Sequence, residues 1–199
     1  MITTRQNFSE RQPRMSICAS GRTMVAINER KIQVARQEPT DMGDDGEMLY
    51  EERMVTEFAY DVCWLEGVAN ENDLLKASKK AVTDAITAYD TSPSVNGFML
   101  NGQRVWLNKD TRVGLMNSTS IAKGMGKTTT TLWFGGMEFE VNCDKAIGLL
   151  SALEMYALEC FNVTAAHKRA VAELNTVEEV LGYDYTKGYP EQLRMEVSL

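Results

Sequence analysis

Residues 122–132, AKGMGKTTTTL, place Gly126, Lys127 and Thr128 in the order that ends a phosphate-binding loop. Such a loop needs another glycine five positions before the Gly-Lys-Ser/Thr ending, where this chain has Ile121. The loop must also follow a strand and open a helix, whose N-terminal amides hold the phosphates. This stretch instead follows a predicted helix and enters a β-prone run of threonines. We interpret it as a connection between a helix and a strand, and a nucleotide-binding enzyme stays a minor alternative.

An acidic stretch from Asp41 to Glu52 has the length of a calcium-binding loop. Its third position is Gly43, which offers no side-chain ligand, and Pro39 precedes it, so no helix leads into it. A solvated acidic loop explains the same residues. We predict no metal site.

His167 is the only histidine and Cys160 stands seven residues before it. On a helix this spacing puts the two side chains on one stripe, but roughly 10 Å apart, too far for direct proton transfer. A nucleophile also needs a base that is held by a third group. We therefore predict no catalytic residue, no cofactor and no enzyme, and expect His167 to be a core or interface residue.

Composition limits the function further. The 199 residues include 44% hydrophobic ones and carry a formal net charge of −7. A core can form, whereas general binding to nucleic acid would need a basic surface. The polar start MITTRQNFSERQPRMS lacks the apolar stretch of a signal peptide, and there is no long uninterrupted apolar run, so we expect no membrane segment. The four scattered cysteines are expected to be reduced.

The N-terminal third is expected to be rich in strands. Residues 1–14 carry three arginines and little that packs, which indicates a flexible arm. Partial alternation of apolar residues over 15–37 and β-forming residues over 54–67 predict strands, and the segment 38–47 between them is typical of a loop. Residues 15–67 therefore form the predicted β-rich region.

Helical periodicity begins in the next segment. Leu75, Ser78, Val82, Ala85 and Tyr89 follow steps of three and four, which predicts a linking helix within residues 68–93 that ends before Pro93.

Residues 94–199 form the predicted C-terminal module. Asn101-Gly102 marks a hairpin turn, Asp110 can cap a helix to about Ala122, and Gly135-Gly136 marks a second hairpin. Trp106 and Trp133 lie in these hairpins and are expected to pack in the core. A long helix over 144–174 follows, and then a short one with a capping box. The fold class is therefore α+β: a β-rich N-terminal part, a central helix, then hairpin, helix, hairpin and long helix.

The long helix carries an apolar seam with heptad spacing over four repeats. Its residues are Ala146, Leu150, Leu153, Ala157, Cys160, Thr164, His167, Val171 and Leu174. Two interpretations stay open: packing against the helix of residues 70–90 of the same chain, or a homo-oligomeric bundle, a trimer or dimer. In the aromatic tail, Tyr183, Tyr185 and Tyr189 are predicted to form an interaction surface.

Several spaced motifs give the chain a family resemblance over residues 89–197. They include RVGLMNS, the run Thr164-Ala165-Ala166-His167, and the segment from Tyr183-Asp184-Tyr185-Thr186 to Gly188-Tyr189-Pro190. Together they resemble a domain of unknown function common in tailed bacteriophages, especially phages of gut Bacteroidetes. The resemblance implies no catalytic or ligand residues. It implies a protein encoded among structural and tail-fibre genes.

The resulting prediction is a bacteriophage virion structural protein, associated with the tail or a fibre, made in the host cytoplasm. Its partners would be other phage structural proteins and further copies of itself, and neither nucleic acid nor membrane. The alternative is a tail-fibre assembly chaperone that is not retained in the virion.

Overall fold

The computed structural model describes residues 2–42, 47–134 and 136–197. The chain divides into two compact units. The first comprises Met1–Val82 and Leu174–Tyr183, and the second comprises Thr83–Glu173 and Asp184–Leu199. The α+β class predicted from the sequence is confirmed. The predicted boundaries are not, because the division falls inside the linking helix and the segment Leu174–Tyr183 joins the N-terminal unit.

The first unit contains a four-stranded antiparallel sheet with the strand order β1-β4-β3-β2. The strands are β1 (Thr4–Phe8), β2 (Met15–Ile17), β3 (Arg22–Met42) and β4 (Met48–Glu66). The prediction of a flexible arm over residues 1–14 is wrong, because Thr4–Phe8 pairs along β4 from Val62 to Phe58. Backbone pairing holds this polar segment, which side-chain composition does not reveal.

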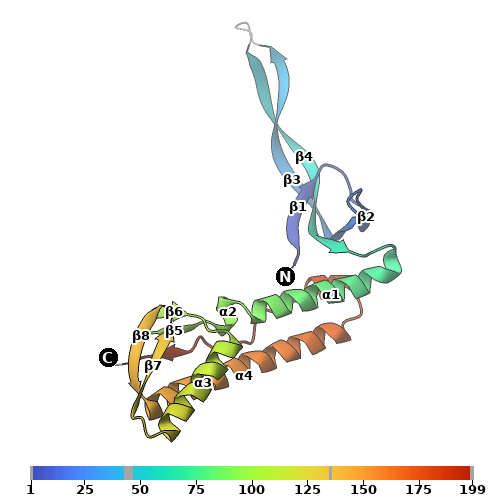
Figure 1. Ribbon diagram of the computed structural model, residues 1–199. Helices are drawn as coiled ribbons and strands as arrows, with labels where there is room; N and C mark the ends of the chain where they lie inside the picture. Colours follow the sequence, from blue (N-terminus) through green and yellow to red (C-terminus); the bar gives the residue numbers. More distant parts are fainter. Residues whose placement is uncertain (1, 43–46, 135, 198–199) are drawn as a thin grey trace. The chain divides into compact units, whose positions relative to one another are not determined.

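The central pair β3 and β4 continues far beyond β1 and β2 as a long two-stranded ribbon (Figure 1). The predicted loop over 38–47 is therefore wrong for Glu38–Met42, which lie in β3, while residues 43–46 lie outside the described residues. A bulge between Ile27 and Arg30 interrupts the register. Asn28 in this bulge has a φ of 57°, a conformation that asparagine tolerates better than most residues.

Both faces of the sheet are buried at the base of the ribbon. Neighbouring residues Val62 and Cys63 point to opposite faces, and both are buried. On one face a cluster forms around Tyr60 and Val62, with Phe8 and Phe58 packed against it. The base is thus a packed core, which anchors the ribbon.

Helix α1 (Glu71–Asp90) leads from the first unit into the second. Its buried positions are Leu74, Ser78, Val82 and Ile86, at a constant spacing of four. The predicted stripe was only partly correct, since Leu75, Ala85 and Tyr89 are half-buried. Helix α5 (Val177–Leu181) begins with the predicted capping box of Thr176 and Glu179.

The second unit follows the predicted order of hairpin, helix, hairpin and long helix. Its elements are α2 (Pro93–Asn96), β5 (Phe98–Leu100), β6 (Gln103–Val105), α3 (Lys109–Gly124), β7 (Thr129–Phe134), β8 (Met137–Asn142), α4 (Cys143–Glu173) and β9 (Arg194–Met195). The Asn101-Gly102 turn has φ values of 48° and 79°, which are those of a type I′ turn. Gly135 of the second predicted turn lies outside the described residues.

Aromatic and aliphatic residues from both hairpins meet α4 in one core. Phe98 and Phe134 pack edge to face, and Leu150 and Leu153 of α4 belong to the same cluster. The C-terminal segment also joins this core, because β9 pairs in parallel with β5 and brings Met195 and Val197 into it. The tail is therefore a structural part of the second unit.

Candidate interaction surfaces

The distal ribbon, which we call the arm, comprises residues 31–42 of β3 and 48–58 of β4. Its register places the charged cross-strand pairs on one face, which nearer the base also holds Val34 opposite Val55. Arg36 lies opposite Arg53, and Glu38 lies opposite Glu51. Direct like-charge pairs are unfavourable. Diagonal ion pairs offset them, since Arg53 Nη1 lies 3.3 Å from Glu38 Oε2 and Arg36 pairs with the buried carboxylate of Glu57.

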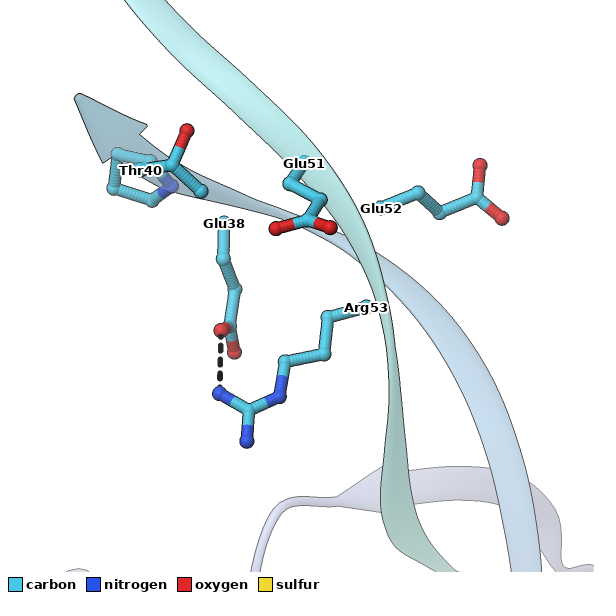
Figure 2. Close-up of a pocket in the computed structure, with 6 residues that line it drawn as sticks. Glu38, Thr40, Glu51, Glu52 and Arg53 are labelled. Atoms are coloured by element: carbon cyan, nitrogen blue, oxygen red, sulfur yellow. Dashed lines mark hydrogen bonds and ion pairs between the residues drawn. The ribbon is translucent and has the colours of Figure 1, made fainter. Parts of the chain in front are cut away.

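Figure 2 shows the outer part of this charged face, with Arg53 reaching the carboxylate of Glu38 while Glu52 points away from both. These residues line a shallow surface hollow together with Thr40 and Glu51. The charged face is thus largely satisfied by its own ion pairs, as expected for a surface that stays in water.

The opposite face of the arm has few charges and several exposed apolar side chains. Tyr50 lies opposite Pro39, and Met54 lies opposite Ala35. Tyr50 is 61% exposed and Met54 is 59% exposed. Met42, Met48 and Leu49 are also exposed at the outer end of the ribbon. We call Tyr50, Met54, Met42, Met48 and Leu49 the apolar face and tip of the arm.

The seam predicted on the long helix lies inside the second unit for most of its length. Six of its residues are buried: Ala146, Leu150, Leu153, Cys160, Thr164 and Val171. Ala157, His167 and Leu174 are half-buried. Leu150 and Leu153 pack against the hairpins, and Cys160 forms a cluster with Val95 and Tyr156. This placement favours packing of the seam within the chain over a contact between copies. The elements that pack against the seam include the two hairpins and α2, whereas the sequence suggested only the helix of residues 70–90.

A polar network closes the C-terminal half of the seam. Thr164 Oγ1 donates to Asp90 Oδ1 at 2.9 Å and also lies 2.9 Å from the Tyr189 hydroxyl. His167 Nε2 lies 2.9 Å from the carbonyl oxygen of Lys187. These groups fix the tail against α4. His167 is therefore a structural residue here, and the Cys160 thiol, whose pKa burial raises, lies in the adjoining cluster.

The predicted tyrosine surface is largely an internal cluster. Tyr185 and Tyr189 each pack edge to face on Tyr89, with ring centroids 5.7 and 5.6 Å apart respectively. Burial raises the pKa of both phenols. Tyr183 belongs to the other unit and is half-buried. Tyr185 and Tyr189 thus pack within their own unit, where the tail folds back, and their role as an interaction surface stays a prediction.

A groove of about 750 Å³ lies in the second unit between the start of α3 and the middle of α4. Trp106, Leu158 and Phe161 give it exposed apolar walls. Buried Arg112 donates from Nε to Glu154 Oε1 and from Nη1 to the carbonyl of Leu107, both at 2.8 Å. The Arg112 guanidinium is thus already engaged, and together with the exposed apolar walls this makes the groove better suited to an apolar side chain than to an acidic ligand.

Sequence reasoning missed these surfaces in two places. Trp106 and Trp133 are partly exposed, although both were predicted to pack in the core. The second is α3, whose apolar Val113 and Ile121 are exposed whereas the polar Arg112 and Thr119 are buried. Arg112 buries its aliphatic chain and its ion pair with Glu154, and a search for apolar residues at helical spacing does not find such a position.

The look-alike phosphate loop has the local structure that its sequence predicts. Helix α3 ends at Gly124, Gly126 has a φ of 81°, and β7 begins at Thr129. The order is helix, turn and strand, so the loop does not open a helix, and the first turn of α4 beside it is engaged by the Cys143 amide donating to the Thr128 carbonyl and by Asp144 pairing with Lys123. Within the described residues no group of three or more histidine, cysteine, aspartate or glutamate side chains is placed to hold a metal ion.

Helix α4 is long and apolar enough to meet the length and composition of a membrane-spanning helix. Of the most apolar 18-residue stretch of α4, only 28% is buried inside the protein. Core helices of soluble proteins can have the same length and composition, and the low burial of α4 shows that it carries excess apolar surface. The exposed part includes Met155, Leu158 and Phe161.

Comparisons with known proteins give no further assignment. A scan against protein-family models found no match, and neither did searches of curated proteins and of solved structures. The chemistry of the arm, of the groove and of the exposed side of α4 is therefore the basis for assigning a function.

Proposed function

We propose that this protein is a structural component of a tailed bacteriophage virion, associated with the tail or a fibre. It acts through protein–protein contacts and self-association. The resemblance of residues 89–197 to a domain of tailed phages supports the assignment to a phage particle. The arm supports the mode of action, and it is the observation that carries the proposal.

The arm has no core of its own. A two-stranded ribbon is marginally stable in water unless another layer packs on it. Here the base is buried on both faces, whereas the outer ribbon exposes Tyr50 and Met54 along one face. An ordered ribbon of this kind gains stability by laying that face on a neighbouring protein, which removes the apolar side chains from water.

Charge favours a basic partner at the outer end of the arm. The segment 38–52 contains seven aspartates and glutamates and no lysine or arginine. This charge equals the formal net charge of −7 of the whole chain. A complementary basic surface on the partner would speed encounter and exclude wrong partners.

The experiment is quantitative mass spectrometry of purified particles compared with infected-cell lysate. A fixed copy number per particle supports the structural role. Abundance in lysate with none in particles would overturn it and establish the assembly chaperone.

An arm variant tests the mode of action in the same assay. Particles are assembled with Tyr50→Ser/Met54→Ser, and the matched control is Gln37→Ser/Thr56→Ser, which changes polar residues on the same face. We expect incorporation to fall at least tenfold for the first variant and to stay unchanged for the second. Equal incorporation of both would exclude the apolar face of the arm as the docking surface.

A further inference from the structure

A second heptad stripe runs along the solvent side of α4, on the face opposite the buried seam. Its seven members, which we call the outer stripe, are Gly148, Ser151, Met155, Leu158, Asn162, Ala165 and Arg169. All seven are exposed, and the steps between them alternate between three and four residues. This is the spacing that keeps one side of a helix against another helix.

The outer stripe is apolar where a surface helix is normally charged. A helix with one buried face carries polar residues on the other face, and a helix that is apolar all round is covered all round. Met155 is 58% exposed, Leu158 is 49% exposed and Phe161, beside the stripe, is 59% exposed. Glu159 and Arg169 are the charged residues among those exposed between positions 148 and 169. The stripe therefore has the character of a surface that is buried in the working state.

Polar residues in and beside the stripe, Asn162 within it and Glu159 next to it, favour protein over lipid as the cover. Glu159 and Asn162 lie near its middle, close to Leu158 and Phe161. A carboxylate or an amide facing hydrocarbon is costly. Against another helix, in contrast, a single asparagine in a heptad position is tolerated and fixes the register.

The stripe is complementary to itself when a second copy runs in the opposite direction. Its large apolar residues, Met155 and Leu158, lie in the middle, and small residues flank them: Gly148 and Ser151 on one side and Ala165 on the other, before Arg169 at the end. Antiparallel pairing brings the small flanking residues together, which allows close helix approach, and sets the large residues of the two middles side by side.

End charges favour the same direction. Asp144 and Lys145 begin α4, and Arg169 and Glu173 end it. With position 151 of one copy opposite position 165 of the other, Asp144 lies within about one turn of both Arg169 and Glu173 of the second copy, whereas parallel copies would place each charge only beside its own kind. Such an arrangement is the isologous contact of a two-fold dimer.

We propose that two copies of this chain associate through the outer stripe with their α4 helices antiparallel. Leu158 and Phe161 also line the groove beside α3, so the partner helix covers its open side. The inference deepens the proposed self-association and rests on it, but it does not depend on a role in the virion. It is tested on the isolated protein, so its failure and that of the virion role are distinguishable.

The first test is the mass in solution, by light scattering and sedimentation equilibrium over a micromolar to millimolar range. We expect the unmodified protein to be a dimer. Met155→Glu/Leu158→Glu should weaken association by more than about 100-fold, because it buries unpaired charges in the contact. The matched control is Val113→Glu/Ile121→Glu, which charges two exposed apolar residues on α3 and should leave the dimer intact.

Three results would overturn the proposal. The first is an unmodified protein that is monomeric over the whole range. The second is a dimer that resists the stripe variant. The third is a monomer that binds vesicles of neutral phospholipid through the same residues. Circular dichroism of the stripe variant checks that its fold is kept, as expected for substitutions at exposed positions.

The second test is cross-linking, which reports the direction of the helices. Ser151→Cys and Ala165→Cys are each made in a Cys18→Ser background and treated with a short bis-maleimide. In an antiparallel pair, two copies of position 151 lie about 20 Å apart, while positions 151 and 165 of different copies lie within about one turn. Cross-linking should need a mixture of the two variants. Cross-linking of each variant with itself would overturn the antiparallel arrangement.

Discussion

The side chain of Asn101 exchanges two hydrogen bonds with the backbone of Val197. Its Nδ2 donates to the Val197 carbonyl at 3.0 Å, and its Oδ1 accepts from the Val197 amide at 2.8 Å. The asparagine thereby extends the parallel pairing of β5 and β9 by one more residue. A turn residue that adopts a positive φ thus also fastens the C-terminal tail to the second unit.

We predict that Asn101→Gly loosens the tail without changing the turn. Glycine keeps the positive φ, whereas the two hydrogen bonds are lost, at a cost of about 1–3 kcal/mol in the free energy of unfolding. Hydrogen exchange at the Val197 amide should accelerate at least tenfold. In Asn101→Asp, whose side chain can accept a hydrogen bond but not donate one, the exchange rate should lie between those of the unmodified protein and the glycine variant. Unchanged protection in the glycine variant would show that β9 alone holds the tail.

The two faces of α4 should respond differently to the same truncation. Leu153→Ala removes a buried side chain from the core of the second unit and should cost about 2–5 kcal/mol in the free energy of unfolding. Leu158→Ala acts on an exposed side chain and should cost less than about 1 kcal/mol in the monomer. Urea unfolding of both variants at a concentration that keeps them monomeric is the measurement. Similar losses would mean that the inner and outer faces have been assigned incorrectly.

The cysteines should differ sharply in reactivity although all four are free thiols. Burial raises the pKa of Cys63 to about 11 and also raises that of Cys160, which leaves little thiolate at neutral pH. Cys143 is buried as well, and Cys18 is half-buried. We expect one fast-reacting thiol per chain with Ellman's reagent in buffer and four in urea. Cys18→Ser should remove the fast reaction. A fast reaction that persists in this variant would show that one of the buried cysteines becomes accessible in the folded protein.

The carboxylate of Asp61 should make the free energy of unfolding depend on pH in the acidic range. Burial alone would raise its pKa, but hydrogen bonds from Arg30 and Asn28 at the bulge lower it below the ordinary 3.8. The folded protein therefore holds this proton less tightly than the unfolded chain does. The stabilisation is complete at a pH above the pKa of Asp61 in the unfolded chain, and it is lost as the pH falls through the lower pKa of the folded protein.

Asp61→Asn tests this dependence. At neutral pH it should lower the free energy of unfolding by about 1–3 kcal/mol. The difference from the unmodified protein should shrink as the pH falls below about 4, where the unfolded chain takes up the proton first, and should level off below the lower folded pKa, where the carboxyl group is protonated in both states. Glu10→Gln, an exposed carboxyl in the same unit, is the control. A difference that is independent of pH would show that the ionised form carries no advantage.

Local rules were sufficient for much of this fold. The type I′ turn at Asn101-Gly102, the capping box of Thr176 and Glu179, the long helix and the look-alike phosphate loop each depend on residues within a few positions of one another. Steric preference, side-chain capping and helical period act over this range, so the sequence alone predicts them.

Tertiary structure decided what those local elements do. Thr4–Phe8 is a strand only because β4 offers its edge, and Glu38–Met42 is a strand only because β4 continues beside it. Long-range backbone pairing leaves little trace in the side chains of polar segments. Likewise, α4 carries two heptad stripes, and only packing shows that Leu153 faces the core while Leu158 faces outward. Periodicity fixes which residues share a face of a helix, whereas the other elements of the fold determine which face is covered.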